Sequence, residues 1–226
     1  MAKKRTSRYK GQGKAARQRQ QQRFWIGAGV LLALLVSGGA VFSLLSTVPE
    51  VSAERLEQEA HLGAEAPRVE VVKYGAYGCH ACRAVHQSRI MERILENYGD
   101  QVRFTFRNVP IIHRNDPLAA EAAQCALDQG DGTFWAFHNG LYSISDSAYN
   151  DLRRGADYAA LAAENGLDGA ALEACLADNT HARTVDHWAE EGDRQRILGT
   201  PTFFVNGQRL NSAAQLESAV VAALNR

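Results

Sequence analysis

The chain has 226 residues, four cysteines and a formal net charge of zero. The charges are unevenly distributed along the chain. Nine Lys or Arg residues and no acidic residue lie between Met1 and Arg23. The rest of the chain therefore has 16 of the 25 basic residues and all 25 acidic residues. The remainder is therefore acidic, which argues against a nucleic-acid-binding protein and predicts no nucleic acid among the partners.

The first 48 residues are typical of a membrane signal-anchor. Residues 1–23 form a basic tail, which the positive-inside rule keeps in the cytoplasm and which can contact anionic lipid. Residues 24–48 carry no charge and are long enough to cross a hydrocarbon core of ~30 Å as one helix. A cleaved signal peptide is the alternative, but its apolar core is usually about 7–15 residues long. We expect a single-pass protein of the cytoplasmic membrane, anchored in its lipid, with the rest of the chain on the periplasmic or extracytoplasmic side.

Residues 49–67 are charged and too few for a domain, so we interpret them as a stalk. Residues 68–226 are enough for one domain with one hydrophobic core. Residues 68–75 are rich in valine and predict a buried strand. A helix is expected from Cys79 to a stop at Gly99, and the alternation over residues 102–107 predicts a second strand.

A helical block follows the second predicted strand. Asp116 is expected to be the N-cap of a helix with Pro117 at its first position, and helical patterns continue to Leu198, so residues of about 112–198 read as an insertion. The pair Asn206-Gly207 predicts a hairpin turn, and Ser212 with Gln215 predicts a capping box for a last helix. The order of elements predicts an α/β layer formed by both ends of the domain, with helices inserted between them.

Cys79 and Cys82 form a C-x-x-C motif at the predicted strand-to-helix junction. Covalent haem attachment is excluded because Arg83, and not histidine, follows the second cysteine. A zinc site needs about four ligands, and His86 is the nearest further candidate. A copper- or zinc-handling module using Cys79, Cys82 and His86 is therefore the alternative to a redox dithiol.

The redox interpretation follows from the position of the motif. A cysteine at a helix N-terminus faces unpaired N–H groups and the positive end of the helix dipole, which stabilise the reactive thiolate. Cys79 is thus the expected nucleophile, and Cys82 the thiol that resolves a mixed disulfide on it. His80 would stabilise the Cys79 thiolate further; the alternative is an ordinary surface histidine. Exchange between thiols and disulfides needs no metal and no organic cofactor, and we expect neither.

Cys125 and Cys175 lie within the helical insertion. In an oxidising compartment two remaining cysteines most simply pair. Such a bridge would close a loop of about 50 residues and add ~4 kcal/mol of stability in the chain-entropy model. Two buried free cysteines that act as small hydrophobes are the alternative.

Three segments carry a family resemblance: the strand with its C-x-x-C helix, the sequence FWAFH of residues 134–138, and GTPTFFVNG of residues 199–207. From about Val69 to Leu224 the chain resembles the DsbA-type branch of the thioredoxin superfamily. The resemblance implies a thioredoxin fold with a helical insertion. It also implies that Thr200 and Pro201 are the cis-proline pair, which packs beside the dithiol and presents backbone groups to a substrate.

The same resemblance implies a function. It is that of a thiol–disulfide oxidoreductase acting on cysteine-containing exported proteins, most simply an oxidase re-oxidised by a quinone-linked membrane partner of the DsbB type. A reductase or isomerase of the same fold is the alternative. DsbC-type isomerases carry an N-terminal dimerisation domain, for which the stalk is too short, so we expect a monomeric oxidase.

The chain departs from this family before the dithiol. The family usually has an acid six positions before the first cysteine, thought to handle protons near the resolving thiol, and often another acid three positions before it. Here these positions hold Lys73 and Ala76. If Lys73 points toward Cys82 it would favour a thiolate there and tune the dithiol; otherwise its stem packs on apolar surface and its amine reaches solvent.

Overall fold

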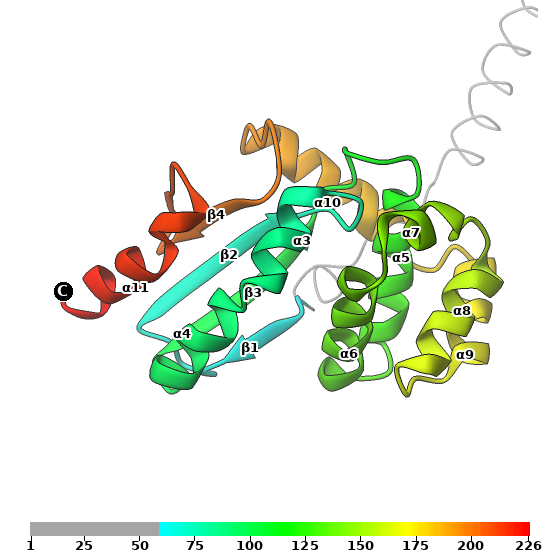
Figure 1. The fold of residues 1–226 in the computed structure, drawn as a ribbon, viewed down its shortest axis with the longest axis horizontal. Coiled ribbons are helices and arrows are strands. Elements are labelled where there is room, and N and C mark those ends of the chain that lie inside the picture. Colours follow the sequence, from blue (N-terminus) through cyan, green and yellow to red (C-terminus); the bar gives the residue numbers. More distant parts are fainter. Residues whose placement is uncertain (1–58) are drawn as a thin grey trace, which may run out of the picture. The chain divides into compact units, whose positions relative to one another are not determined.

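The computed structural model describes residues 59–226 (Figure 1). The predicted basic tail, the predicted membrane anchor and residues 49–58 of the predicted stalk lie outside the described residues. Within residues 59–226, none of the helices combines the length and the apolar character needed to cross a bilayer.

A five-stranded mixed sheet forms the centre of the fold, in the order β1-β3-β2-β4-β5. The central strands β2 and β3 run parallel, and the other three pairings are antiparallel. The α/β architecture predicted from the sequence is confirmed, as is the turn at Asn206 and Gly207, which both have positive φ angles. The strands are β1 His61–Gly63, β2 Val69–Gly75, β3 Val102–Asn108, β4 Thr202–Val205 and β5 Gln208–Arg209.

Strand β1 lies in the stretch that we interpreted as a stalk. It pairs antiparallel with β3, and the Phe106 N–H donates to the Ala60 carbonyl at 3.2 Å just before it. The Glu59 carboxylate accepts a hydrogen bond of 2.8 Å from Arg107 on β3. Three residues are too few to show the alternation that marks a strand, so the sequence pattern did not reveal this one.

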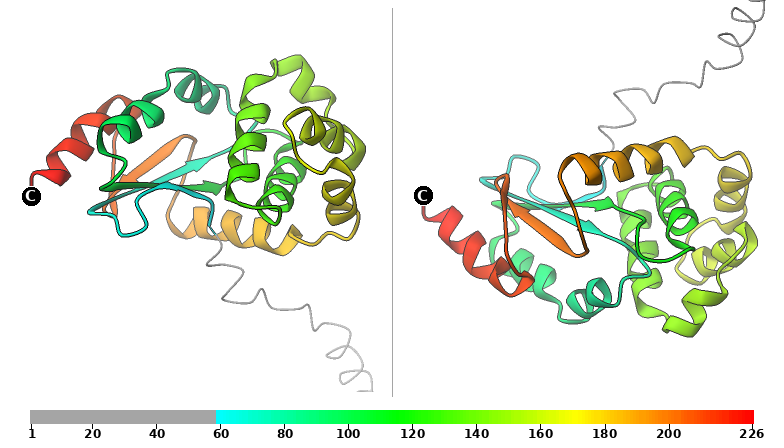
Figure 2. Two further views of the ribbon diagram at one scale, coloured as in Figure 1. Left: turned by 90° about the horizontal axis from the view of Figure 1, so that it is seen from below. Right: turned by 90° about the horizontal axis from the view of Figure 1, so that it is seen from above.

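Helices cover both faces of the sheet (Figure 2). α3 His80–Gln87, α4 Ile90–Tyr98 and α11 Leu216–Leu224 lie on one face, and α10 Ala182–Arg194 lies on the other. The first face buries a core cluster that includes Val69, Val71, Ile94, Phe104 and Leu216.

The expected helix from Cys79 to Gly99 is broken into α3 and α4. Arg89 adopts a left-handed conformation, with φ of 54°. The Ser88 hydroxyl donates to the Val85 carbonyl at 2.7 Å, and the Arg89 N–H donates to the His86 carbonyl, three residues back instead of four. A serine hydroxyl that bonds local backbone competes with the helical ladder, so α3 ends here and α4 starts in a new direction.

The insertion forms a second helical layer beyond one end of the strands (Figures 1 and 2). Its core buries Phe134, Phe137, Leu141, Tyr158 and Leu172 completely. The last part of the predicted insertion, α10, packs against β3 as well as against α5, so it returns the chain to the sheet. The insertion helices are α5 Asp116–Leu127, α6 Asp131–Ser143, α7 Asp146–Asp151, α8 Gly155–Glu164 and α9 Gly169–Ala177.

Candidate active site

Cys79 is the N-cap residue of α3, directly after the turn that leaves β2. Its backbone is extended, and its Sγ accepts a hydrogen bond of 3.3 Å from the Cys82 N–H. When it is protonated, the Cys79 thiol donates a hydrogen bond of 3.1 Å to the Thr200 carbonyl oxygen. The sulfur therefore meets helix N–H groups on one side and the segment before β4 on the other.

The two thiols differ strongly in acidity. The pKa of Cys79 is lowered to about 5, first by a hydrogen bond from the Cys82 thiol and then by the Thr200 side chain and the backbone N–H groups of Cys82 and Ala81. Burial raises the pKa of Cys82, whose side chain is fully buried, and the hydrogen bond to Cys79 raises it further. Both cysteines are free thiols in this structure. At neutral pH the pair therefore holds an anionic Cys79 and a protonated Cys82.

Thr200 and Pro201 are joined by a cis peptide bond beside Cys79. Leu198 in the same segment is 94% exposed, and Ile111 and Ile112 in the loop after β3 are about half exposed. These three are the exposed large apolar side chains among the described residues.

His80 lies at the surface of α3. Its side chain is 87% exposed, and its Nδ1 lies 3.8 Å from the Asp146 carboxylate on α7. Asp146 also pairs with Arg83 of α3, which joins the sheet layer to the helical layer. The contacts that lower the pKa of Cys79 come from Cys82, Thr200 and backbone groups, so the geometry gives no support to the tuning role that we expected for His80.

Lys73 points into the core instead of reaching solvent. Its side chain is 1% exposed, and its Nζ has no hydrogen-bond partner among the described residues. The Nζ lies 4.9 Å from the ring centroid of Tyr142 and 5.4 Å from that of Phe106. Burial lowers the pKa of Lys73, and the nearby Cys82 opposes that shift most strongly. The alternative in which the amine reaches solvent is therefore wrong.

Asp116 holds the loop before Cys79, a role that the sequence did not reveal. Asn115, and not Asp116, occupies the N-cap position of α5. The buried Asp116 carboxylate accepts hydrogen bonds from the backbone N–H groups of Gly78, Ile112 and His113 and from a tyrosine hydroxyl. The sequence shows the Asp-Pro pair, but it does not show that the Asp116 carboxylate points inward, because that direction depends on hydrogen bonds with residues distant in the chain.

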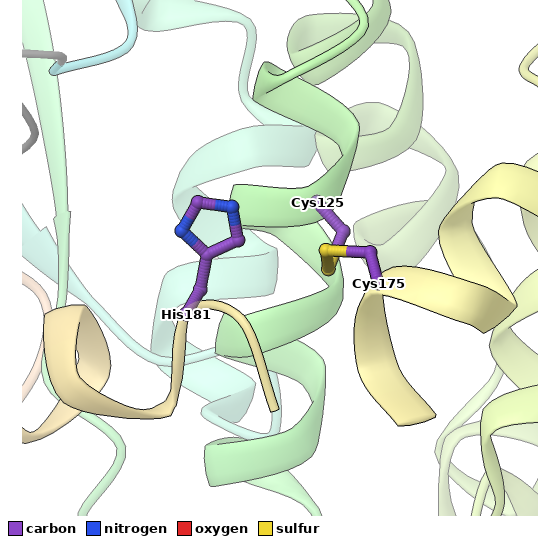
Figure 3. A group of neighbouring side chains, drawn as sticks. All are labelled: Cys125, Cys175 and His181. Carbon is purple, nitrogen blue, oxygen red and sulfur yellow. A yellow bond between two sulfur atoms is a disulfide. The ribbon is translucent and has the colours of Figure 1, made fainter. Parts of the chain in front are cut away.

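Cys125 of α5 and Cys175 of α9 form a disulfide within the helical layer (Figure 3). The His181 ring lies beside it, and its Nε2 is 2.6 Å from the Asp128 carboxylate. Among residues 59–226, Cys125, Cys175 and His181 are the one group of potential metal ligands gathered within 4.8 Å. Both sulfurs are bonded to each other, so they are not available as thiolate ligands in this state.

The structure does not bring together the potential ligand atoms of Cys79, Cys82 and His86 within 4.8 Å of one another. The His86 ring instead stacks on Tyr142, with the ring centroids 5.3 Å apart. The alternative of a metal-handling module built on these three residues therefore has no support in the described geometry.

The family model described as Thioredoxin matches residues 55–224. Disulfide bond formation protein D of Bacillus subtilis is 26% identical over 167 residues, which cover 69% of this chain and 71% of that protein. The Na(+)/H(+) antiporter NhaA 3 of Salinispora tropica is 32% identical over 163 residues, which cover 71% of this chain. The chain spans less than a quarter of that antiporter, 23% of its length.

Among solved structures, oxidised BdbD from Bacillus subtilis superposes with a TM-score of 0.68 at 24% sequence identity, covering 76% of this chain and 95% of that one. The likeness extends over both the sheet and the inserted helices. The family model matches three quarters of this chain, and the C-x-x-C motif lies at the start of a helix in this fold, so the chain belongs to the thioredoxin family.

Proposed function

We propose that the chain is a thiol–disulfide oxidoreductase that forms disulfides in exported proteins outside the cytoplasmic membrane. The observation that carries the proposal is the difference in acidity between the two thiols. The pKa of Cys79 is lowered to about 5, and Cys82 is a buried thiol. A relative that aligns over most of this chain is named disulfide bond formation protein D. The predicted N-terminal anchor would keep the domain at the membrane, where a quinone-linked partner of the DsbB type could re-oxidise it.

The acidity of Cys79 supports the proposed direction of exchange. Hydrogen bonds that stabilise the Cys79 thiolate stabilise the reduced chain, and a stable reduced form makes the disulfide form a stronger oxidant. A substrate thiolate would attack the Cys79 sulfur of the disulfide, forming a bond to Cys79 and releasing Cys82 with the electron pair. A second substrate thiol would then attack the substrate's own sulfur in the mixed disulfide, leaving as products the substrate disulfide and the reduced pair.

The apolar residues near Cys79 suit an unfolded substrate. Leu198 precedes the Thr200 carbonyl that contacts Cys79, and Ile112 is linked through Asp116 to the Gly78 N–H just before Cys79. We propose that these exposed side chains together form one apolar surface, of the kind that marks an interaction site. We propose that they receive apolar stretches of reduced, extended polypeptide.

The reduction potential of the Cys79–Cys82 couple tests the direction. Equilibration with glutathione redox buffers, followed by alkylation and mass spectrometry, should give a value nearer to about −120 mV than to about −270 mV. The unequal thiols predict this because they favour the reduced form. A value near that of cytosolic thioredoxin would contradict the oxidase and favour a reductase or isomerase.

A pH series adds a second readout of the same cause. The pKa of Cys79 is depressed in the folded chain, so its ionisation stabilises the reduced fold fully above the ordinary thiol value of 9.0, and that contribution is lost as the pH falls through about 5. The reduced chain should therefore melt at a higher temperature than the oxidised chain near neutral pH. This gap should narrow as the pH falls toward about 5.

A further inference from the structure

Asp116 lies where three segments of the fold meet. Its Oδ1 accepts a hydrogen bond of 2.7 Å from the Gly78 N–H, in the turn between β2 and α3, and another of 2.7 Å from the Tyr149 hydroxyl on α7. Its Oδ2 accepts hydrogen bonds from the N–H groups of Ile112, at 3.1 Å, and His113, at 2.7 Å. One side chain therefore joins the turn before the dithiol to the loop after β3 and to the helical layer.

Burial makes these hydrogen bonds strong. Only 1% of Asp116 is exposed, so its carboxylate has lost its water and depends on the four donors that replace it. Hydrogen bonds to a charged acceptor are roughly twice as strong as those between neutral groups. The carboxylate therefore holds the Gly78 turn against the loop after β3 more firmly than a neutral side chain would.

Gly78 packs against the same loop with no room for a side chain. A Cβ atom built on Gly78 would lie 2.4 Å from the His113 Cβ and 2.7 Å from the Asp116 Oδ1. Bonded side chains do not tolerate such distances, so glycine is what allows this close approach. Cys79 follows Gly78 directly and is the N-cap of α3. The position of the reactive sulfur is therefore set against the loop after β3.

That loop carries part of the apolar surface assigned above to the substrate. Ile111 and Ile112 are 49% and 47% exposed, and the Ile112 N–H is one of the groups that Asp116 binds. A polypeptide bound there must also bring its own sulfur to Cys79. Two contacts made at once bind tightly only when their spacing is already fixed, because a loose connection has to be ordered at each encounter.

We propose that Asp116 is a positioning residue that sets substrate selectivity, because it holds the apolar loop at a fixed distance from Cys79. Dithiol polypeptides with apolar flanks are then preferred over polar ones and over small thiols. Asp116 acts through the backbone of Gly78 and Ile112 and takes no part in the sulfur chemistry. The proposal rests on the proposed disulfide exchange and adds to it the class of polypeptide that the chain selects.

Asp116→Asn is the change that separates the two halves of this joint. An amide keeps one acceptor oxygen, and its NH2 group is a donor. In place of Oδ2 the NH2 would face the two N–H groups of Ile112 and His113. In place of Oδ1 it faces only one N–H, and the Tyr149 hydroxyl can turn to accept from it. The amide oxygen should therefore stay with the loop, and the bond to Gly78 is the one lost.

The test follows single turnovers of the oxidised full chain with excess dithiol peptide, quenched with acid and read by mass spectrometry. One peptide has leucine and valine around its cysteines, and the other has serine at those positions. In Asp116→Asn the half-saturating concentration of the apolar peptide should rise about tenfold, the lower end of what one hydrogen bond to a charged group contributes. The limiting rate should not change, because the Cys82 N–H still holds the Cys79 sulfur.

The serine peptide and reduced glutathione complete the comparison. Both should react with Asp116→Asn at the rate of the unaltered chain, since neither uses the apolar loop. Asp128→Asn is the matched control, because it makes the same chemical change at the other end of α5, where the carboxylate binds His181. It should keep the preference for the apolar peptide.

Three results would overturn the proposal. These are a folded Asp116→Asn that keeps the full preference, an equal loss of rate with both peptides and glutathione, and an unaltered chain with no preference for the apolar peptide. If the oxidised unaltered chain forms a disulfide in neither peptide, the proposed function fails instead, so the two failures are distinguishable.

A measurement on the unaltered chain covers the case in which Asp116→Asn does not fold. The oxidised, isotope-labelled chain is titrated with the apolar peptide carrying serine in place of its cysteines, and the Gly78 and Ile112 amide signals are followed by NMR. Because one carboxylate binds both N–H groups, a peptide that shifts the Ile112 signal should shift the Gly78 signal in proportion. A Gly78 signal that stays in place while the Ile112 signal saturates would contradict the proposal.

Discussion

Replacing Cys82 with serine should turn the chain into a trap that stays covalently joined to partners that carry a disulfide. Cys79 keeps its position at the N-terminus of α3 and its contact with Thr200, so a disulfide partner can still react with it. The thiol that would release the partner is gone, and turnover should fall on the order of a thousandfold, as for other essential groups of a covalent mechanism. Non-reducing gels of cell-envelope extracts should show mixed disulfides that disappear with reductant.

The matched control is Cys79→Ser. Cys82 has no exposed surface and a raised pKa, so it should not trap partners by itself. Efficient trapping by Cys79→Ser would contradict the assignment of Cys79 as the nucleophile. In the unaltered reduced chain, iodoacetamide at about pH 6 should alkylate Cys79 first, since its pKa is lowered to about 5.

Removing the bridge between α5 and α9 should give the largest loss of stability. Cys125 and Cys175 are separated by 50 positions. A loop of that length predicts that the double change Cys125→Ala with Cys175→Ala lowers the free energy of unfolding by about 4 kcal/mol. Urea denaturation followed by circular dichroism measures this directly. The comparison is made on a Cys79→Ser, Cys82→Ser background, so that one disulfide at most is present.

The same double change separates stability from chemistry when it is made in the chain with its dithiol intact. The bridge lies in the helical layer and makes no contact with the Cys79 sulfur in the described geometry. Exchange with glutathione at a temperature where the fold persists should therefore proceed at the unaltered rate. An unchanged melting temperature would show that the bridge adds no stability. Slower exchange with glutathione would show that loss of the bridge changes the geometry of the dithiol through α5.

Local patterns in the sequence were enough to predict the central strands, the hairpin turn and the strand-to-helix junction at Cys79. Each depends on residues that are neighbours in the chain, such as alternating side chains in β3 or the Asn206-Gly207 pair. The acidity difference between Cys79 and Cys82 follows from the same local arrangement, because a helix N-terminus exposes one cysteine to N–H groups and turns the other inward.

Features that depend on distant contacts could not be read in this way. The break before α4 is set by hydrogen bonds around Ser88, and the inward turn of Asp116 is set by N–H groups from three separate loop positions. The direction of Lys73 was left open because helices cover both faces of the sheet, so neither side of β2 leads simply to water. For His80, adjacency in sequence to Cys79 suggested a tuning role, and the structure shows an exposed ring whose Nδ1 lies 3.8 Å from the Asp146 carboxylate.

Strand β1 has a practical consequence for producing the domain in the laboratory. A shortened chain that starts at residue 68, the boundary suggested by composition, would lose β1 and leave the outer edge of β3 unpaired. Open strand edges template association with other copies. The Arg107 side chain would also lose its Glu59 partner. Expression of a well-behaved fragment should therefore begin no later than Glu59, and a fragment that starts at residue 68 should precipitate or form oligomers.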